Sequence, residues 1–181
     1  RAAGARRGMA LDLRRVRPYA PAALIALGAV AIAWGFAATT LVHTRPMGLP
    51  LDDSYIYLTY AKQLGRGQPF TYFAGGGYSA GSTSALWPMV LAPFWTLGAR
   101  GHALVWVSFL LCAALYAAVA LGCYAFVRRL AGELAGIAAA VVVLAIAPFA
   151  WCALSGMEVA FASALLVAML LSIFARMSFA L

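Results

Sequence analysis

Charged residues are scarce in this chain of 181 residues: they make up only 10% of it, and five of them are acidic. A soluble domain carries about 25% charged residues, so this low charge and the 65% share of hydrophobic residues argue against a soluble globular enzyme. A disordered chain is excluded as well, because it needs high charge and low hydrophobicity. The mean hydropathy of +0.92 indicates a membrane protein, and the length allows about four to six helical spans.

Cysteine is rare too, and its spacing argues against a disulfide or a metal site. Cys112 and Cys123 lie in one apolar run, where a helix would separate them by roughly 16 Å along its axis. That is too far for a disulfide bond. Cys152 has no Cys or His at the spacing of a metal ligand. We therefore expect all three to be small apolar side chains in packed helices.

Positive charge, in contrast, is plentiful and concentrated at the start of the chain. The net charge is +8, and six arginines precede residue 18. Such a cluster is typical of the cytoplasmic flank of a membrane helix, whereas a nucleic-acid-binding chain would carry a basic stripe with stacking aromatics. We therefore predict a basic cytoplasmic arm over residues 1–17, a transmembrane region over residues 18–181 and no nucleic-acid partner.

Four long stretches contain no Asp, Glu, Lys or Arg, and each predicts a membrane-spanning helix. They cover residues 18–44, 103–127, 134–157 and 159–175. Their alanine and leucine content, without period-two alternation, favours helices over barrel strands. A cleaved signal peptide is the alternative for the first stretch, but its apolar run is longer than an ordinary signal sequence and three more spans follow.

Residues 67–99 are also uncharged, but their Gly and Pro content predicts a loop followed by a short helix. The apolar part, residues 85–97, is too short for a confident span. If it does not cross the membrane, nine basic residues lie inside and four outside; if it crosses, the split is seven to six. The first split follows the positive-inside rule better. We therefore predict an all-helical fold of four spans with both termini inside, and a first outer loop over about residues 43–102 that carries interfacial helices at residues 54–64 and 85–97.

Three of the five acidic residues fall on the predicted outer side: Asp52, Asp53 and Glu158. Acidic residues at membrane depth are costly and point to a function. Adjacent carboxylates where the chain leaves the membrane suit catalysis, because one can accept a proton from a hydroxyl group while the other orients it or holds a cation. The alternative for the pair is helix capping, which needs only one acid. The alternative for Glu158 is a snorkelling carboxylate at a helix start.

The two remaining acids have simpler interpretations. Asp12 lies in the basic arm, where we expect a solvated charge. Glu133 follows Arg129 by four residues at the inner end of a predicted helix, so we expect an ion pair between them.

Cations and aromatic residues of the outer loop are further candidates for substrate binding. Arg45, Arg100 and His102 could meet a lipid phosphate at the outer interface, although most such cations only snorkel. Tyr55 and Tyr78 belong to an aromatic loop that suits an interfacial belt first and a sugar-stacking surface second.

Three segments of the chain, in this order, resemble the N-terminal part of GT-C membrane glycosyltransferases. They are LDDSYIY from residue 51, GSTSALW from residue 81 and LSGME from residue 154. The chain is most similar to bacterial polyprenyl-phosphate-sugar-dependent enzymes of the arabinofuranosyltransferase type, and more distantly to protein O-mannosyltransferases and lipid A aminoarabinose transferases. The resemblance extends over roughly residues 20–176.

This resemblance implies inverting transfer of a sugar from a polyprenyl-phosphate donor to a glycan, lipid or protein acceptor, at the outer face of the bacterial plasma membrane. It implies that Asp52 is the catalytic base and that Asp53 assists it, or helps to hold a divalent cation such as Mg, Mn or Ca. It adds Glu158, Tyr78 and Trp87 to the candidate substrate contacts. Family members have many more spans, so we expect this chain to be the N-terminal part of a longer enzyme.

Two functions of other classes remain open: a transporter or flippase-like protein, in which the three outer acids form an ion pathway, and a non-catalytic membrane subunit. Transporters place ionisable groups near the bilayer midplane, whereas these acids lie at predicted helix ends. That position favours chemistry at the membrane surface. We expect the three acids to converge on one outward-facing cavity beneath residues 78–87, with Arg45, Arg100 and His102 nearby.

Overall fold

The computed structural model describes residues 19–179, which form seven α-helices. They are α2 (Ala20–His43), α3 (Asp52–Gly65), α4 (Leu86–Thr96), α5 (His102–Ala131), α6 (Glu133–Ala145), α7 (Ala147–Leu154) and α8 (Val159–Phe179). The predicted all-helical class is confirmed for this part of the chain. The predicted basic arm, residues 1–17, lies outside the described residues.

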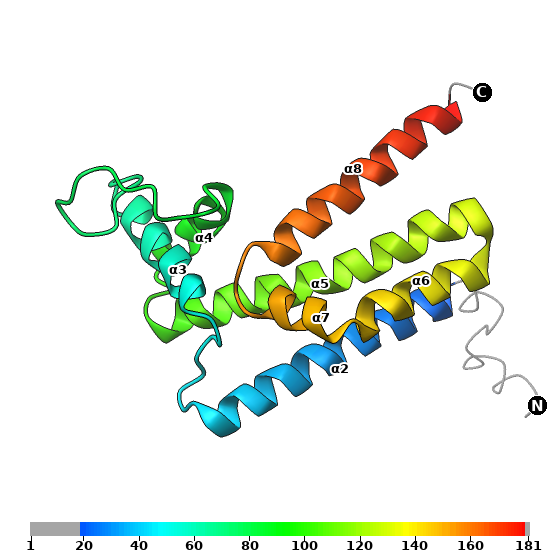
Figure 1. Cartoon of the computed structure of the whole chain (residues 1–181), viewed down its shortest axis with the longest axis horizontal. Coiled ribbons are helices and arrows are strands. Elements are labelled where there is room, and N and C mark those ends of the chain that lie inside the picture. The colour runs from blue at the N-terminus through cyan, green and yellow to red at the C-terminus, as the bar shows by residue number, and fades with distance from the viewer. Residues whose placement is uncertain (1–18, 180–181) are drawn as a thin grey trace, which may run out of the picture.

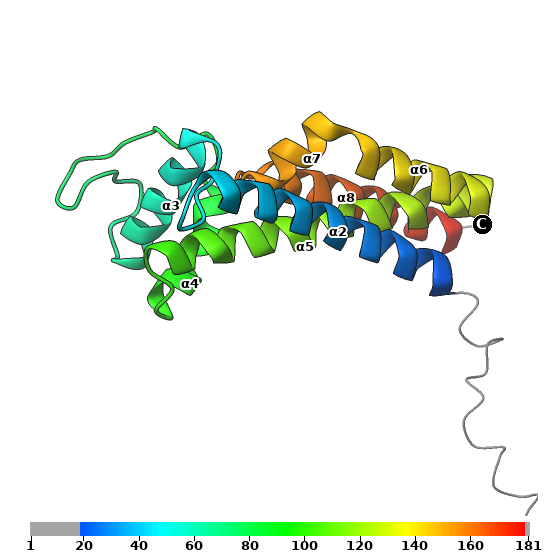
Figure 2. The same cartoon turned by 90° about the horizontal axis from the view of Figure 1, so that it is seen from below.

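The long helix α5 forms the centre of the molecule, and α2, α6 and α8 lie along it (Figure 1). The short helices α3 and α4 pack against each other at the end where α5 begins, and the loop between them extends away from the bundle (Figure 2). Helices are thus present at both positions predicted for the outer loop. Their location at a membrane surface stays a prediction.

Small residues let the long helices approach one another closely. Ala29, Ala33 and Ala37 are buried at four-residue intervals and form one stripe of α2. Where α5 meets α8, a Cβ atom added to Gly122 would lie only 2.4 Å from Val167 Cγ1. Small residues at helix contacts are typical of membrane proteins, in which tight packing takes the place of a hydrophobic driving force.

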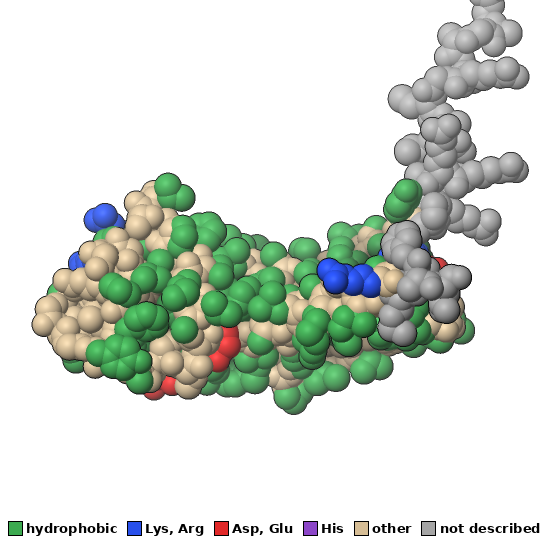
Figure 3. Space-filling model, turned by 90° about the horizontal axis from the view of Figure 1, so that it is seen from above, with side chains coloured by type: hydrophobic (Ala, Val, Ile, Leu, Met, Phe, Trp, Pro, Cys, Tyr) green, Lys and Arg blue, Asp and Glu red, His purple; other side chains and the backbone are tan. Residues whose placement is uncertain are grey.

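Three helical segments are long and apolar enough to cross a membrane: Ala20–His43, His102–Ala131 and Val159–Arg176. Their mean hydropathies are 2.0, 2.4 and 2.1. Apolar side chains also cover much of the outer surface (Figure 3), and Leu165 and Met169 of α8 are half exposed. The described residues therefore have the character of an integral membrane protein, as the composition predicted.

The predicted third span, residues 134–157, is not one continuous helix. α6 ends at Ala145 and α7 begins at Ala147, and the two are bent by 66° about Ile146, whose backbone is extended. Pro148 lies in the first turn of α7, a position that tolerates proline, whereas proline within a continuous helix would break it. The described residues thus contain three candidate spans, or four if α6 and α7 together form a broken one.

A tyrosine of α5 replaces the backbone donor that Pro148 lacks. In a continuous helix, the amide of residue 148 would donate to the Leu144 carbonyl, but proline has no N–H group. The Tyr116 hydroxyl donates to that carbonyl instead, at 3.1 Å. Because backbone polar groups inside a membrane have to be paired within the protein, this bond stabilises the break between α6 and α7.

The link between α5 and α6 corrects the predicted ion pair of Glu133. Its partner is Arg128, whose Nη1 lies 3.7 Å from Glu133 Oε2. The Tyr124 hydroxyl joins the pair, because it donates to Glu133 Oε1 at 2.6 Å and accepts from Arg128 Nη1 at 3.0 Å. Pairing with Arg129 assumed one helix, but Gly132, with a φ of +87°, interrupts the helix between the two residues.

Candidate functional site

Asp52 and Asp53 are the first two residues of α3, and both side chains are exposed. The N-cap residue is Leu51, and no side chain makes a capping hydrogen bond at this helix start. The two charges still lie at the positive end of the helix dipole, which is favourable for carboxylates. The two acids can therefore stabilise the helix start through their charge, but neither caps it with a hydrogen bond.

Helix α3 carries different chemistry on two opposite faces. Asp53 and Tyr57 lie four residues apart and share one face. Tyr55, Thr59 and Lys62 share the opposite face, which lines a cavity. The body of α3 therefore separates Asp53 from the cations of this region.

Two hydroxyl groups connect α3 to Glu158. The Thr83 hydroxyl donates to Glu158 Oε1 at 3.3 Å, so Tyr57 is the donor in its own hydrogen bond with Thr83. Burial raises the pKa of Tyr57 to about 12, and the nearby negative charges of Glu158 and Asp53 add to this rise. Tyr57 therefore stays neutral at physiological pH and donates its hydrogen bond to Thr83, which in turn donates to Glu158.

The second carboxylate oxygen of Glu158, Oε2, is buried and has no hydrogen-bond partner among residues 19–179. A buried acceptor without a donor costs free energy, and in native proteins such a group needs a specific explanation. One explanation is a function: when the residues that cover it move, Oε2 can accept a hydrogen bond from a ligand.

Side chains from three helices hold the connection between α7 and α8 in place. Ser54 Oγ of α3 donates to the Ser155 carbonyl at 2.7 Å. The Trp87 indole N–H of α4 and the Ser108 hydroxyl of α5 both donate to the Gly156 carbonyl, at 2.9 and 3.1 Å. All three donor side chains are fully buried. Residues far apart in the sequence thus fix this connection beside the start of α3.

Gly156 is required by the geometry of this connection. Its φ of +88° is unfavourable for any residue with a side chain. An added Cβ atom would also lie 2.6 Å from Leu49 Cδ1. Glycine therefore permits both the backbone conformation and the close approach of Leu49.

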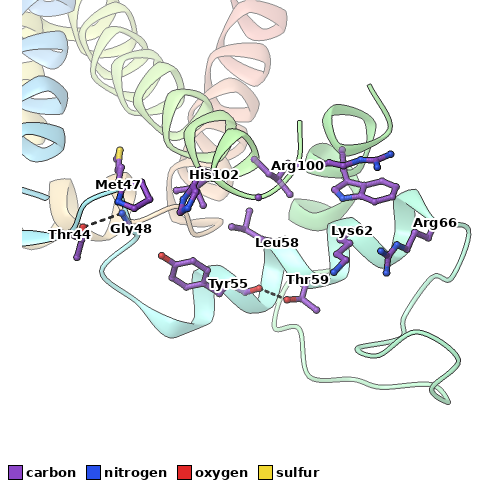
Figure 4. A pocket seen from close by; sticks show the side chains of 15 residues that line it. Thr44, Met47, Gly48, Tyr55, Leu58, Thr59, Lys62, Arg66, Arg100 and His102 are labelled. Atoms are coloured by element: carbon purple, nitrogen blue, oxygen red, sulfur yellow. Dashed lines mark hydrogen bonds between the residues drawn. The ribbon is translucent and has the colours of Figure 1, made fainter. Parts of the chain in front are cut away.

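A cavity of about 720 Å³ lies on the other face of α3, between the α2–α3 connection and the start of α5 (Figure 4). Tyr55 lines it, and its hydroxyl accepts a hydrogen bond from the Leu49 amide at 2.8 Å. The basic residues that line it are Lys62, Arg66, Arg100 and His102. We call it the basic cavity, and its charge suits an anionic ligand.

The predicted substrate-binding residues lie in several different settings. Tyr55, Arg100 and His102 line the basic cavity. Tyr78 is 80% exposed on the loop between α3 and α4. Arg45 is exposed, and its Nε donates to the Leu41 carbonyl at the end of α2.

The acids and the cations do not share one cavity, in contrast to the expected arrangement. Asp52, Asp53 and Glu158 are all absent from the lining of the basic cavity. The physical reason is the rotation of α3, which points the face shared by Asp53 and Tyr57 towards Thr83 and Glu158 and away from this cavity. Trp87 is fully buried, so in this structure it supports the α7–α8 connection from inside.

Tyr57 and Thr83 are the site residues that sequence reasoning did not single out. The signal for Tyr57 was present, because it follows Asp53 by one helical turn. Thr83 belongs to the GSTSALW segment, but nothing in the sequence indicated its contact with Glu158, which lies 75 residues later.

The predicted divalent cation would find few protein ligands at this site. The described residues contain no group of three or more His, Cys, Asp or Glu side chains that could hold a metal ion. Asp52 and Asp53 supply two carboxylates, so any further ligands would have to come from water or substrate.

Comparison with protein-family models, curated proteins and solved structures finds no match to this chain. The fold alone therefore defines its class: an all-helical chain with long apolar helices of the kind that cross membranes.

Proposed function

We propose that the protein is a membrane glycosyltransferase that moves a sugar from a polyprenyl-phosphate donor to an extracytoplasmic glycan, lipid or protein acceptor at the bacterial plasma membrane. One observation carries this proposal. The three segments that resemble GT-C enzymes meet in space, through the bonds from Ser54 to Ser155, from Trp87 to Gly156 and from Thr83 to Glu158.

The chemistry needs a base at an exposed position, and Asp52 meets this requirement. The acceptor oxygen attacks the anomeric carbon of the sugar, the bond from that carbon to the phosphate oxygen breaks, and the lipid phosphate leaves with the electron pair. Asp52 takes the proton of the acceptor hydroxyl. Asp53 lies beside it and orients it, while Glu158 Oε2 accepts a hydrogen bond from the bound sugar.

The depth of the site in the membrane supports surface chemistry. Arg128 and Arg129 mark the inner end of α5. About twenty residues of helix cross the hydrocarbon core, and counting back from Val127 by that number reaches Ser108. Since Ser108 donates to Gly156, this count supports a position of the α7–α8 connection at the outer border of the core rather than at its midplane.

A transporter is the second candidate, and one observation favours it. The pair α6–α7 is broken at Ile146, and broken helices are common at the substrate sites of transporters. Incubation of membranes that contain the protein with labelled polyprenyl-phosphate sugars separates the two functions. Label in an acceptor supports the transferase, whereas uptake without transfer supports the transporter.

Asp52→Asn is the first variant to measure in this transfer assay. We expect transfer to fall by a factor on the order of 10² or more, because asparagine cannot act as a base. Expression should not change, since Asp52 makes no capping hydrogen bond and asparagine is tolerated at helix starts.

Glu133→Gln is the matched control, because this acid lies at the opposite end of α5 and pairs with Arg128. It should leave transfer unchanged. Near-normal transfer by Asp52→Asn, together with loss of transfer in Asp53→Asn, would show that Asp53 is the base. Near-normal transfer by both variants would end the catalytic interpretation of the pair.

A further inference from the structure

The basic cavity holds a concentration of charge that the proposed reaction does not use. Two of its guanidinium groups stack on one indole ring: Arg100 Cζ lies 4.7 Å and Arg66 Cζ 5.5 Å from the centre of the Trp95 ring. Within residues 19–179, no carboxylate lies at ion-pair distance from these two arginines or from Lys62 and His102. Unpaired arginines in a fixed geometry are suited to bind a phosphate group.

An apolar groove of about 400 Å³ lies between α2 and α5. Ala37 and Leu41 of α2 line one side, and Trp106, Phe109 and Ala113 of α5 line the other. Small alanine side chains leave room between two helices that otherwise pack closely. The groove therefore suits a thin hydrocarbon chain.

The groove leads to the basic cavity along both helices. On α2, Leu41 of the groove is followed one turn later by Thr44, which lines the cavity. On α5, Trp106 of the groove is preceded one turn earlier by His102 of the cavity. Residues one turn apart lie on the same helix face, so the charged and the apolar spaces adjoin.

The dimensions match one leaflet of a membrane. The groove extends along α5 from Trp106 to Ala117, a distance of about 16 Å at 1.5 Å per residue. Half of the hydrocarbon core is about 15 Å thick. The groove is therefore as long as an acyl chain in the outer leaflet, and the cavity lies where its headgroup would be.

We propose that the basic cavity and the adjoining groove bind one anionic phospholipid of the outer leaflet, with its phosphate at Arg66 and Arg100 and one acyl chain between α2 and α5. This lipid is distinct from the reacting donor. Neither Asp52 nor Asp53 lines the basic cavity.

The proposal is tested by native mass spectrometry of the purified protein, with phosphatidylglycerol and phosphatidylcholine of identical chains as probes. We expect phosphatidylglycerol to bind at least about tenfold more tightly, because both headgroups offer a phosphate to the arginines but the choline cation of phosphatidylcholine repels them. The double variant Arg66→Gln/Arg100→Gln should lose this preference. Arg129→Gln, which removes a cation at the other end of α5, should keep it.

The acyl chain is tested separately. Ala113→Leu narrows the groove and should weaken phosphatidylglycerol binding by about tenfold or more through steric overlap. In the unchanged protein, glycerol phosphate and inorganic phosphate should not displace the lipid at equal concentration. This comparison needs no variant, so it holds even if Ala113→Leu fails to fold.

Three results would overturn the proposal. Equal binding of the two phospholipids removes the preference for a headgroup of net negative charge. Displacement by inorganic phosphate identifies a free-anion site, and displacement by an equal amount of a polyprenyl phosphate identifies the donor site. Asp52→Asn should bind phosphatidylglycerol normally, so failure of the catalytic proposal and failure of this one are distinguishable.

Discussion

Glu158 is partly buried, whereas Asp52 and Asp53 are exposed. One of its oxygens accepts from Thr83 at 3.3 Å, and the other is buried without a partner among the described residues. This arrangement lowers stability. Natural proteins tolerate such strain chiefly where activity depends on it.

Glu158→Gln should therefore separate stability from activity. Glutamine keeps an acceptor for Thr83 and removes the buried charge, so we expect a gain of about 1 kcal/mol in the free energy of unfolding. Transfer should fall, because the sugar loses a charged acceptor. Thermal unfolding in detergent and the transfer assay measure the two effects on one preparation. Unchanged transfer would show that Glu158 only supports the fold.

At the scale of single residues, the sequence predicted positions better than surroundings. The spacing of Asp53 and Tyr57 on one helix face follows from helical geometry alone. The burial of Trp87 does not, because its partner Gly156 lies 69 residues away. Aromatic residues in a loop indicate a surface in general, and only the tertiary contact shows that this one is inside.

At the scale of helices, local patterns located α3 and α4 well but missed the break between α6 and α7. The amphipathic pattern and the flanking Gly and Pro residues fixed both short helices within two residues of their ends. The uncharged run at residues 134–157 contains Pro148, which signals a break, but a proline alone does not decide whether the span bends there. That choice depends on Tyr116, which supplies the missing donor from another helix.

Tyr116→Phe should destabilise the protein by about 1–3 kcal/mol, because the Leu144 carbonyl is then left without a donor. In a Pro148→Ala background the cost should be smaller, since the amide of residue 148 can then reach that carbonyl. Unfolding of the two single variants and the double variant gives a coupling free energy, which we expect to exceed about 0.5 kcal/mol. Strict additivity would show that the hydroxyl does not compensate for the proline.

Gly156→Ala should disturb the connection between α7 and α8. The positive φ and the overlap with Leu49 together should cost about 1–3 kcal/mol, measured as a lower unfolding temperature. Gly35→Ala is the matched control, because Gly35 is in mid-helix and an added Cβ meets nothing within 4 Å. It should be neutral or stabilising by up to about 1 kcal/mol. Equal effects at both positions would contradict the role assigned to Gly156.

For the whole molecule, the orientation in the membrane is the main prediction. In a cysteine-free background, an impermeant maleimide should label Ala74→Cys and Arg100→Cys in intact cells. Arg129→Cys, at the other end of α5, should be labelled only after permeabilisation. Labelling of Arg100→Cys solely from the cytoplasm would mean that α4 crosses the membrane and would reject the four-span arrangement.

The overall class could be predicted from composition, because hydrophobicity decides it without any knowledge of contacts. The division of the outer region into an acidic and a basic side could not be predicted from the sequence. It depends on how α3 is rotated about its own axis against α5, and a rotation by half a turn would have placed Asp53 in the basic cavity. No local pattern in the sequence fixes that angle.

The bonds that close the site also set an order of assembly. Ser54 and its partner Ser155 are 101 residues apart, and the other two links join positions 69 and 75 residues apart. A chain is made from its N-terminus, so α3 and α4 exist well before the carbonyl groups that fix them. Contacts of such long sequence separation form late. Until Ser155 and Gly156 emerge from the ribosome, the buried donors of Ser54 and Trp87 have no acceptor, and the nascent protein is without a finished site.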